Sequence, residues 1–278
     1  MSRGTVDRDY ILGTTDQETL RLGIQHESWL PLATACWERA GVSPGHRVID
    51  VGAGPGFAAL DLAAIVGESG HVTAVERSAR FVEAGKEMAR GRGISNIDFL
   101  ELDLMTDELP AGAHDVAWCR WVASFVDSPV TLVDKLARVV RPGGVAVFHE
   151  YADYGSWRYA PTQPLLDEYI GRVMHSWRSA GGEPDVATSI PAMLAERGFT
   201  IELIEPRVFC VGPRHPLWTW ISTFVESNLG RLVELRQCDE PWADSVRSKL
   251  RDAQNDPATL MITPMVLEII ARKDSGSN

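Results

Sequence analysis

The sequence predicts a doubly wound α/β fold built on a mostly parallel sheet. Between residues 46 and 150, short apolar runs of strand length alternate with longer segments of helical periodicity. A glycine-rich turn joins the first apolar run to the first of these helical segments. Strands that alternate with helices are typical of a parallel sheet with right-handed crossovers.

Within this region, five strands are expected at HRVIDVG, HVTAVE, IDFLELD, DVAWC and GVAVFHE. Helices are expected at AALDLAAIV, after the capping residue Ser78, and over SPVTLVDKLARVV, where Pro129 lies in the first turn. The RPGG that follows predicts the end of the last helix, with Gly143 or Gly144 as its left-handed cap.

Outside this region, residues 16–40 are expected to be helical, with Asp16 as the N-cap. After residue 150, helices are expected at TQPLLDEYIGRVMHSW, at SIPAMLAERG and across residues 216–254. Two further strands, FTIELIEPRVFCV and TLMITPMVLEIIARK, complete a seven-stranded sheet. The inward face of the first of these helices is expected to comprise Leu166, Tyr169, Ile170, Val173 and Trp177.

This pattern predicts one large sheet domain with helical additions. Residues 46–213 and 257–274 form the predicted core, residues 1–45 an N-terminal helical cap, and residues 214–256 a helical insertion. A further addition is expected at 155–180. These additions either cover the carboxyl edge of the sheet as a lid or form a dimer interface, so the protein is expected to be either a monomer or a homodimer.

Composition excludes several classes of protein. With 45% apolar and 23% charged residues, the chain is not wholly disordered. Its 27 basic and 38 acidic side chains give a net charge of −11, which argues against nucleic-acid binding. No apolar run approaches the roughly 18 residues of a membrane helix, and MSRGTVDRDY lacks the apolar core of a signal peptide.

The cysteines and tryptophans indicate the surroundings of the protein and of its ligand. Four well-separated cysteines in no metal-binding spacing (Cys36, Cys119, Cys210 and Cys238) predict free thiols, no bound metal and a cytoplasmic location. Nine tryptophans favour an aromatic-lined pocket.

The chemistry is predicted from DVGAGPG (residues 50–56), which ends the first strand and begins a helix. Glycines allow positive φ and a close approach of backbone to ligand, and the helix start presents free N–H groups. Glu76 ends the second strand, where its carboxylate can accept both hydroxyls of a ribose. Asp103 follows the third strand, so both carboxylates should lie on the edge where ligands bind.

Two other nucleotide-binding motifs do not fit this loop. The dinucleotide fingerprint G-x-G-x-x-G would require its third glycine at the position of Phe57. A phosphate-binding P-loop is excluded because no Gly-Lys-Ser/Thr follows the glycines.

The segments VIDVGAGPGFAALDLA, AVERS, DFLELD, DVAWCRWV and LARVVRPGGVAVFHE together resemble the motifs of class I S-adenosylmethionine (SAM)-dependent methyltransferases. They are most similar to the ubiquinone/menaquinone C-methyltransferases and the small-molecule natural-product methyltransferases. The resemblance covers residues 46–150 and extends loosely to the N-terminal segment and the last two strands. It implies a Rossmann-like, seven-stranded sheet with an antiparallel last strand, SAM as cofactor and S-adenosylhomocysteine (SAH) as product.

The resemblance also implies a cofactor site. In it Glu76 holds the ribose, Asp103 takes the adenine amino group, and the backbone of Cys119 and Arg120 lies near the methionine part. The residues assigned to the cofactor are Tyr10, Gln25, Gly52, Gly54, Gly56, Glu76, Arg77, Asp103, Leu104, Cys119 and Arg120. Many relatives also carry a histidine shortly after the fourth strand, but WVASFVDS contains none.

Candidate catalytic residues follow the fifth strand in HEYADY, where His149, Glu150 and Tyr151 are expected to face the acceptor. His26, His175 and His215 are further candidates on the cap segments. The predicted activity is methylation of a small molecule, such as a natural product or secondary metabolite, at oxygen, nitrogen or carbon. The alternative is a cyclase or isomerase that binds SAM without consuming it. Neither reading involves nucleic acid or a membrane.

Overall fold

The computed structural model describes residues 15–275 of the 278-residue chain. Its centre is a seven-stranded sheet of order β3-β2-β1-β4-β5-β10-β7. Strands β1 to β5 are mutually parallel, whereas β10 is antiparallel to β5 and β7, so the predicted fold class is confirmed. The strands are β1 (Arg47–Val51), β2 (His71–Glu76), β3 (Ile97–Glu101), β4 (His114–Arg120), β5 (Val140–Asp153), β7 (Phe199–Arg207) and β10 (Met265–Lys273).

Helices cover both faces of this sheet, and each face has its own apolar core. Alternation along β1 shows the division, since Val48 packs with the first group of helices and Ile49 with the second. The first group is α1 (Asp16–Arg39), α2 (Phe57–Val66) and α3 (Ala79–Arg92). The second is α4 (Pro129–Val139) and α6 (Ile190–Ala195). Ser78 caps α3 as predicted, because its hydroxyl accepts a hydrogen bond from the backbone N–H of Phe81.

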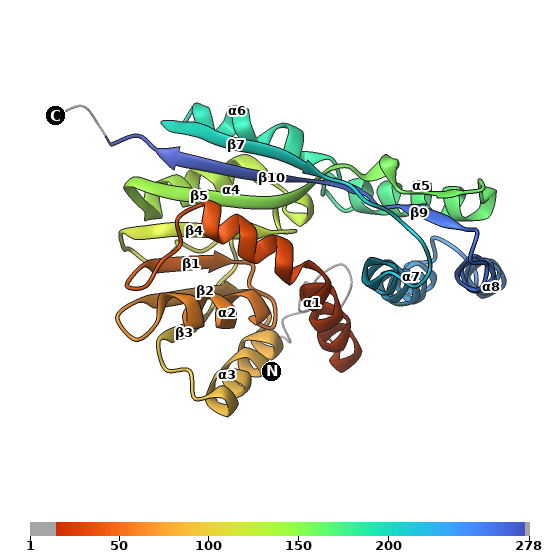
Figure 1. Ribbon diagram of the computed structural model, residues 1–278, viewed down its shortest axis with the longest axis horizontal. Coiled ribbons are helices and arrows are strands. Elements are labelled where there is room, and N and C mark those ends of the chain that lie inside the picture. The colour runs from red at the N-terminus through yellow and green to blue at the C-terminus, as the bar shows by residue number, and fades with distance from the viewer. Residues whose placement is uncertain (1–14, 276–278) are drawn as a thin grey trace, which may run out of the picture.

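Helix α1 belongs to the core as well as to the cap. In its C-terminal half, Ala33, Cys36 and Trp37 are buried with side chains of the sheet and of α2. Its N-terminal half reaches beyond the sheet toward α7 (Figure 1). The N-cap is Thr15, whose hydroxyl accepts from the N–H of Glu18, so the prediction of Asp16 as N-cap is wrong.

A helical cap lies beyond one end of the sheet, where Figure 1 shows α5, α7 and α8 together. The predicted helical stretch 216–254 is two helices, because Asp239 caps a second one through the N–H of Trp242. The cap consists of α5 (Pro164–Ser179), α7 (Pro216–Glu234), α8 (Glu240–Asn255) and a small sheet of β6 (Arg158–Ala160), β9 (Leu260–Ile262) and β8 (Cys210–Val211). The five residues predicted for the inward face of α5 are all buried. Within residues 15–275, no helix has the length and apolar character needed to span a membrane.

Strand β5 is longer than predicted at both ends. Val140 leaves α4 in an extended conformation and pairs with His114, so the helix has no left-handed cap. Gly143 does have φ +75°, but it lies within the strand region, which corrects the predicted role of RPGG. Pairing with β10 continues as far as Asp153. The predicted catalytic residues 149–151 therefore lie inside the strand and not after it.

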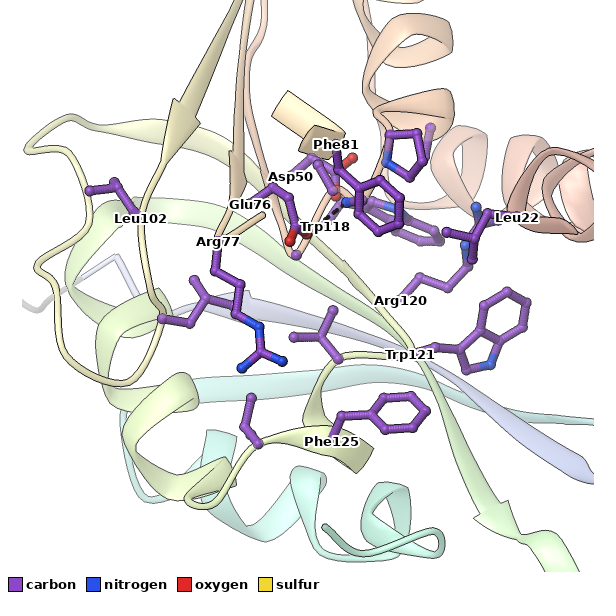
Figure 2. A pocket seen from close by; sticks show the side chains of 18 of the residues that line it. Leu22, Asp50, Glu76, Arg77, Phe81, Leu102, Trp118, Arg120, Trp121 and Phe125 are labelled. Atoms are coloured by element: carbon purple, nitrogen blue, oxygen red, sulfur yellow. Dashed lines mark hydrogen bonds between the residues drawn. The ribbon is translucent and has the colours of Figure 1, made fainter. Parts of the chain in front are cut away.

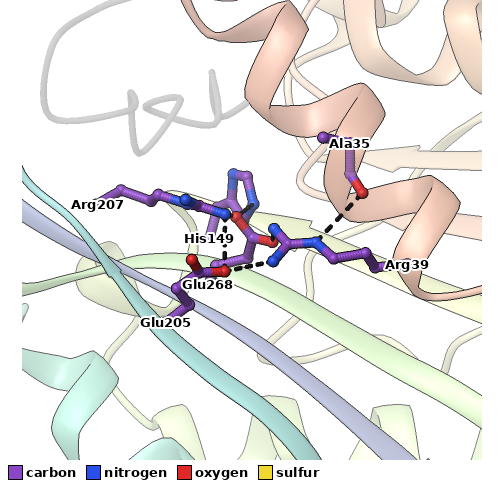
Figure 3. A network of polar contacts seen from close by, with 6 residues as sticks. All are labelled: Ala35, Arg39, His149, Glu205, Arg207 and Glu268. Carbon is purple, nitrogen blue, oxygen red and sulfur yellow. Dashed lines mark hydrogen bonds and ion pairs between the residues drawn. The ribbon is translucent and has the colours of Figure 1, made fainter.

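A buried acid network fastens α1 to the edge of the sheet (Figure 3). The carboxylate of Glu268, on β10, is fully buried and pairs with Arg39 of α1 and with Arg207 of β7, whose Nε lies 3.0 Å away. Glu205 contacts both arginines, and its Oε2 lies 2.9 Å from Nη2 of Arg207. His149 Nε2 lies 3.5 Å from Glu268. Two cations and two carboxylates thus balance one another at the junction of α1, β7 and β10.

We expect Glu268→Gln to lower the free energy of unfolding by about 1–3 kcal/mol, because an amide cannot pair with two guanidinium groups. The control is Glu202→Gln on the neighbouring β7, whose pair with Arg272 is exposed and should contribute about 0–1 kcal/mol. Urea unfolding monitored by tryptophan fluorescence measures both variants. Equal losses in the two variants would contradict a special role for the Glu268 network.

Candidate functional site

A cavity of about 290 Å³ lies where β1, β2 and β4 end, and Figure 2 shows side chains that line it. From the side of α1 it is lined by Leu22, Gln25 and His26. The turn after β4, which includes the short helix η1 (Ala123–Phe125), contributes Trp121 and other lining residues. The cavity occupies the edge at which open α/β sheets bind ligands, as the sequence predicted.

The glycines of the loop after β1 have two different roles, since some line the cavity and one is needed for packing. Gly52 and Gly54 line the cavity at φ +67° and +56°, so both use the left-handed region that favours glycine. A Cβ at Gly52 would lie 2.4 Å from a methyl group of Val122, so the loop packs closely against the turn after β4. Gly56, at φ +88°, is not among the lining residues, and a Cβ there would lie 2.4 Å from the ring of Phe99. Gly56 is thus required by packing beneath the loop.

Glu76 lines the cavity at the end of β2 and also holds the loop in place. One carboxylate oxygen accepts the N–H of Gly54 at 3.0 Å, and the other accepts the N–H of Ser78 at 2.9 Å. Burial raises the pKa of Glu76, and these two hydrogen bonds oppose that rise. Each oxygen retains a lone pair, so the carboxylate can accept two hydroxyl groups in the geometry that its backbone partners fix.

The loop after β3 forms another wall through Asp103 and Leu104. Asp103 Oδ1 accepts the N–H of Met105 at 2.8 Å, and Asp107 accepts the N–H of Asp103 at 2.9 Å. Lys135, a buried lysine of α4, donates to the carbonyls of Leu104 and Asp107 at 2.8 and 2.6 Å. Hydrogen bonds from side chains of the loop itself and from Lys135 of α4 therefore stabilise the loop that carries the predicted adenine contacts.

Two groups of opposite charge at the cavity each have one buried atom without a hydrogen-bond partner among the described residues. Asp50 is the last residue but one of β1 and is buried, and its Oδ2 has no hydrogen-bond partner among the described residues. Arg120 Nη1 is also buried and unpartnered there. Burial raises the pKa of Asp50 to about 7 and lowers the pKa of Arg120 to about 10. Buried polar groups normally have partners, so this pair indicates a ligand that carries both charges.

Residues of α1 close the cavity through polar contacts. His26 Nδ1 lies 3.0 Å from Arg120 Nη2, and its Nε2 lies 2.8 Å from Oδ2 of Asp61. Gln25 Oε1 accepts hydrogen bonds from Arg21 at 2.8 Å and from the indole of Trp220 at 3.0 Å. These contacts connect α1 to β4 on one side and to the cap helix α7 on the other.

Glu150 organises the turn after β4. Its fully buried carboxylate accepts the backbone N–H groups of Val122 and Ala123 at 2.6 and 2.9 Å, and the N–H and hydroxyl of Ser124 at 3.4 and 2.9 Å. Burial raises the pKa of Glu150 to about 7, against the lowering effect of these donors. In the same turn, Trp121 adopts φ +53°, a rare conformation for a bulky residue.

The predicted catalytic residues do not line the cavity. His149 is fully buried behind it, against the indole rings of Trp29 and Trp118, and Glu150 is occupied by the turn described above. Tyr151 is buried with its ring stacked on that of Trp121. The cap histidines His175 and His215 are absent from the lining as well.

Most predicted cofactor residues do meet at the cavity. Those that line it are Gln25, Gly52, Gly54, Glu76, Arg77, Asp103, Leu104 and Arg120. Cys119 does not, because its side chain is buried with its thiol 3.7 Å from Glu150. Tyr10 lies outside the described residues.

Cys36, His149 and Glu268 bring three potential metal ligands within 4.8 Å of one another. Arg39 and Arg207 already neutralise the Glu268 carboxylate there, and burial raises the pKa of Cys36 to about 12. A metal-bound thiolate is thus disfavoured, and the group is best described as part of the ion-pair network. The four cysteines are all free thiols.

Residues 49–148, from β1 into β5, match the protein family described as "Methyltransferase domain". The chain is 28% identical over 128 residues to an uncharacterized methyltransferase, YcgJ of Bacillus subtilis, a match that covers 46% of this chain and 47% of YcgJ. It is 26% identical over 175 residues to the ubiquinone/menaquinone biosynthesis C-methyltransferase UbiE of Ectopseudomonas mendocina, covering 58% of this chain and 68% of UbiE. Residues 49–148 are therefore a methyltransferase domain, and the relatives and the fold are those of class I SAM-dependent methyltransferases.

Solved structures of other proteins share the fold of this chain. The [4+2]-cyclase SpnF aligns with a TM-score of 0.57 at 23% identity, covering 88% of this chain and 81% of SpnF. Coclaurine N-methyltransferase, solved with N-methylheliamine and SAH, aligns with a TM-score of 0.57 at 17% identity, covering 88% of this chain and 72% of that enzyme. The fold is thus shared by proteins with different named reactions.

The residues at the cavity fit SAM. The cofactor has an adenosine with two vicinal hydroxyls and an amino-acid end with an ammonium and a carboxylate group. Glu76 offers acceptors for the hydroxyls, while the unpartnered Asp50 and Arg120 offer one charge for each group of the amino-acid end. Asp50, Trp118, Trp121 and Phe125 were not predicted as cofactor residues, although Asp50 begins the glycine motif and could have been found from it.

We expect Glu76→Ala to weaken SAH binding about ten- to several-hundred-fold, or about 1.5–4 kcal/mol, because two charge-assisted hydrogen bonds are lost. The variant should also melt at a lower temperature, since Glu76 holds the N–H groups of Gly54 and Ser78. Isothermal titration calorimetry measures the affinity. Glu101→Ala is the control, because Glu101 lies opposite Glu76 on the neighbouring strand β3 but does not line the cavity. A dissociation constant within about threefold of wild type, under 1 kcal/mol, would reject the ribose contact.

Proposed function

We propose that this protein transfers the methyl group of SAM to a small-molecule acceptor that binds between the cavity and the helical cap. The observation that carries the proposal is the pair of buried atoms without partners, Oδ2 of Asp50 and Nη1 of Arg120, beside the glycine loop of a methyltransferase domain. A dipolar amino-acid group satisfies both charges at once, and a nucleotide phosphate does not.

The proposed cofactor position follows the lining residues from one end of the cavity to the other. Asp103 and Leu104 face the adenine, and Glu76 holds the ribose. Asp50 attracts the ammonium group and Arg120 the carboxylate group of the methionine end. Bound SAM supplies an electrophilic methyl group on a sulfonium ion. The protein aligns this methyl with the acceptor and excludes water from both.

The acceptor side of the cavity is aromatic and apolar. Trp121 lines it and stacks on Tyr151 and Trp220, with ring centroids 5.9 Å apart in both pairs. Phe125 and Leu22 also line the cavity. Flat aromatic walls favour planar apolar ligands, so we propose a planar natural product or related metabolite as the acceptor. The name of UbiE indicates quinone chemistry for that relative and supports testing quinols first.

The acceptor is proposed to need little help in losing a proton. His26 lines the cavity, but both of its ring nitrogens have partners, in Arg120 and Asp61. Its imidazole is thus not a free base. An acceptor that is already nucleophilic, such as an ionised quinol or an amine, fits this arrangement better than an aliphatic alcohol.

The lack of a free base at His26 also fits a second function, in which SAM is bound but not consumed. A cyclase or isomerase of this kind needs the cofactor site and the aromatic wall of the cavity, and it does not need a base. Incubation with SAM and a panel of quinols, phenols and amines separates the two functions by mass spectrometry. Methyl transfer gives SAH together with an acceptor heavier by one methylene unit, whereas rearrangement gives a product of unchanged mass and intact SAM.

The proposal predicts that SAH affinity increases as pH rises toward about 7, the pKa of Asp50. Only the ionised carboxylate attracts the ligand ammonium, so each unit of pH below 7 should weaken binding by up to about tenfold. At still lower pH the dependence should level off, once the pH falls below the pKa that Asp50 has in the complex. Calorimetry over about pH 5–8 measures this slope.

Asp50→Asn is the matched variant, because it keeps the shape of the side chain and removes the charge. It should bind SAH weakly at high pH and show a smaller pH slope. Wild-type affinity in Asp50→Asn at about pH 8, above the pKa of Asp50, would contradict the proposed ammonium contact.

A further inference from the structure

We infer that His26 and Asp61 are positioning residues for the amino-acid end of the cofactor, and that they act through the guanidinium group of Arg120. The three side chains come from α1, α2 and β4 and form a continuous chain of hydrogen bonds. The inference rests on the proposed function, because Arg120 must meet the carboxylate of SAM or SAH.

The partners of His26 determine its protonation. A guanidinium group can only donate hydrogen bonds, so His26 Nδ1 accepts from Arg120 Nη2 at 3.0 Å. The ring proton is therefore on Nε2, which donates to the Asp61 carboxylate at 2.8 Å. Burial lowers the pKa of His26, and the positive charges of Arg120 and Arg92 lower it further. The hydrogen bond and the charge of Asp61 oppose this by raising the pKa. The neutral imidazole thus connects a carboxylate to a guanidinium without a charge of its own.

This chain of contacts fixes the direction of the guanidinium group. Nη2 of Arg120 is held by His26, while Nη1 is buried without a partner among the described residues. The group lies 5.8 and 5.1 Å from the ring centroids of Trp118 and Trp121, which limits its movement on the sheet side. His26 is itself supported by stacking on Phe57 at 5.8 Å. A fixed guanidinium with one free edge is suited to a carboxylate ligand.

Asp61 affects the ligand only indirectly. It does not line the cavity, and its side chain is 29% exposed on the far side of His26. Its other ion pair is a long one, with Arg92 at 3.9 Å. Loss of the Asp61 carboxylate should thus release the imidazole and, through it, the guanidinium, while leaving the contacts to adenosine in place.

Two ligands that differ only at the amino-acid end test this inference. SAH has the carboxylate, whereas 5′-methylthioadenosine keeps the adenosine and thioether but lacks the amino-acid group. For Asp61→Ala we expect SAH binding to weaken about three- to tenfold, and 5′-methylthioadenosine binding to stay within about twofold of wild type. His26→Phe keeps the stacking on Phe57 and should show a larger loss of the same selectivity. Asp61→Asn retains an acceptor for Nε2 and should restore most of the SAH affinity.

Two controls separate this effect from general damage. The exposed pair of His71 and Asp98, 3.0 Å apart, has the same chemistry away from the cavity, so Asp98→Ala should leave both affinities unchanged. Arg92→Gln removes the long ion pair but keeps the hydrogen-bonded chain. Melting temperatures confirm that each variant is folded.

Calorimetry with both ligands gives a clear outcome. Selective loss of SAH affinity in Asp61→Ala supports the inference. An equal loss for both ligands, or no loss for either, overturns it. Wild-type protein that binds neither ligand would instead overturn the proposed function itself.

Discussion

The shape of the cavity depends on the buried carboxylate of Glu150. It gathers the backbone N–H groups of three successive residues after β4 and so bends the chain sharply at the end of that strand. The bend places Val122 against Gly52, where no side chain could fit, and orients Trp121 into the cavity. An acid that resembles a catalytic group by its position in the sequence thus works as the support for the cavity wall.

The cavity differs from the buried ion-pair network in the hydrogen bonding of its charged groups. At the junction of α1 with β7 and β10, Glu205 and Glu268 are matched by Arg39 and Arg207. At the cavity, by contrast, Asp50 and Arg120 retain unpartnered atoms although both are buried. An unpaired buried charge destabilises a fold, so such groups are maintained where a ligand completes them. The contrast between the two clusters separates a structural network from a binding site in the same protein.

The sequence predicted those features that depend on neighbouring residues. Apolar runs located the strands, and the order of elements placed Glu76 and Asp103 on one edge. Features that depend on distant segments were missed or misplaced. The C-terminal extension of β5 follows from pairing with β10, more than a hundred residues away in the sequence. The role of Glu150 depends on a turn formed by residues 121–124. No local pattern contains either relation.

The same distinction explains why the cofactor is easier to recognise than the acceptor. Contacts proposed for SAM come mostly from the ends of consecutive strands, where a short motif is enough to identify them. The proposed acceptor site lies where α1, the turn after β4 and the cap helix α7 meet through Trp29, Trp121 and Trp220, and no single motif covers these segments. Trp121 lies at their meeting point, with a strained backbone and a buried indole N–H that has no partner among the described residues. Strain of this kind persists where the surroundings impose it, often at functional sites, and so Trp121 is the residue around which the acceptor should be sought.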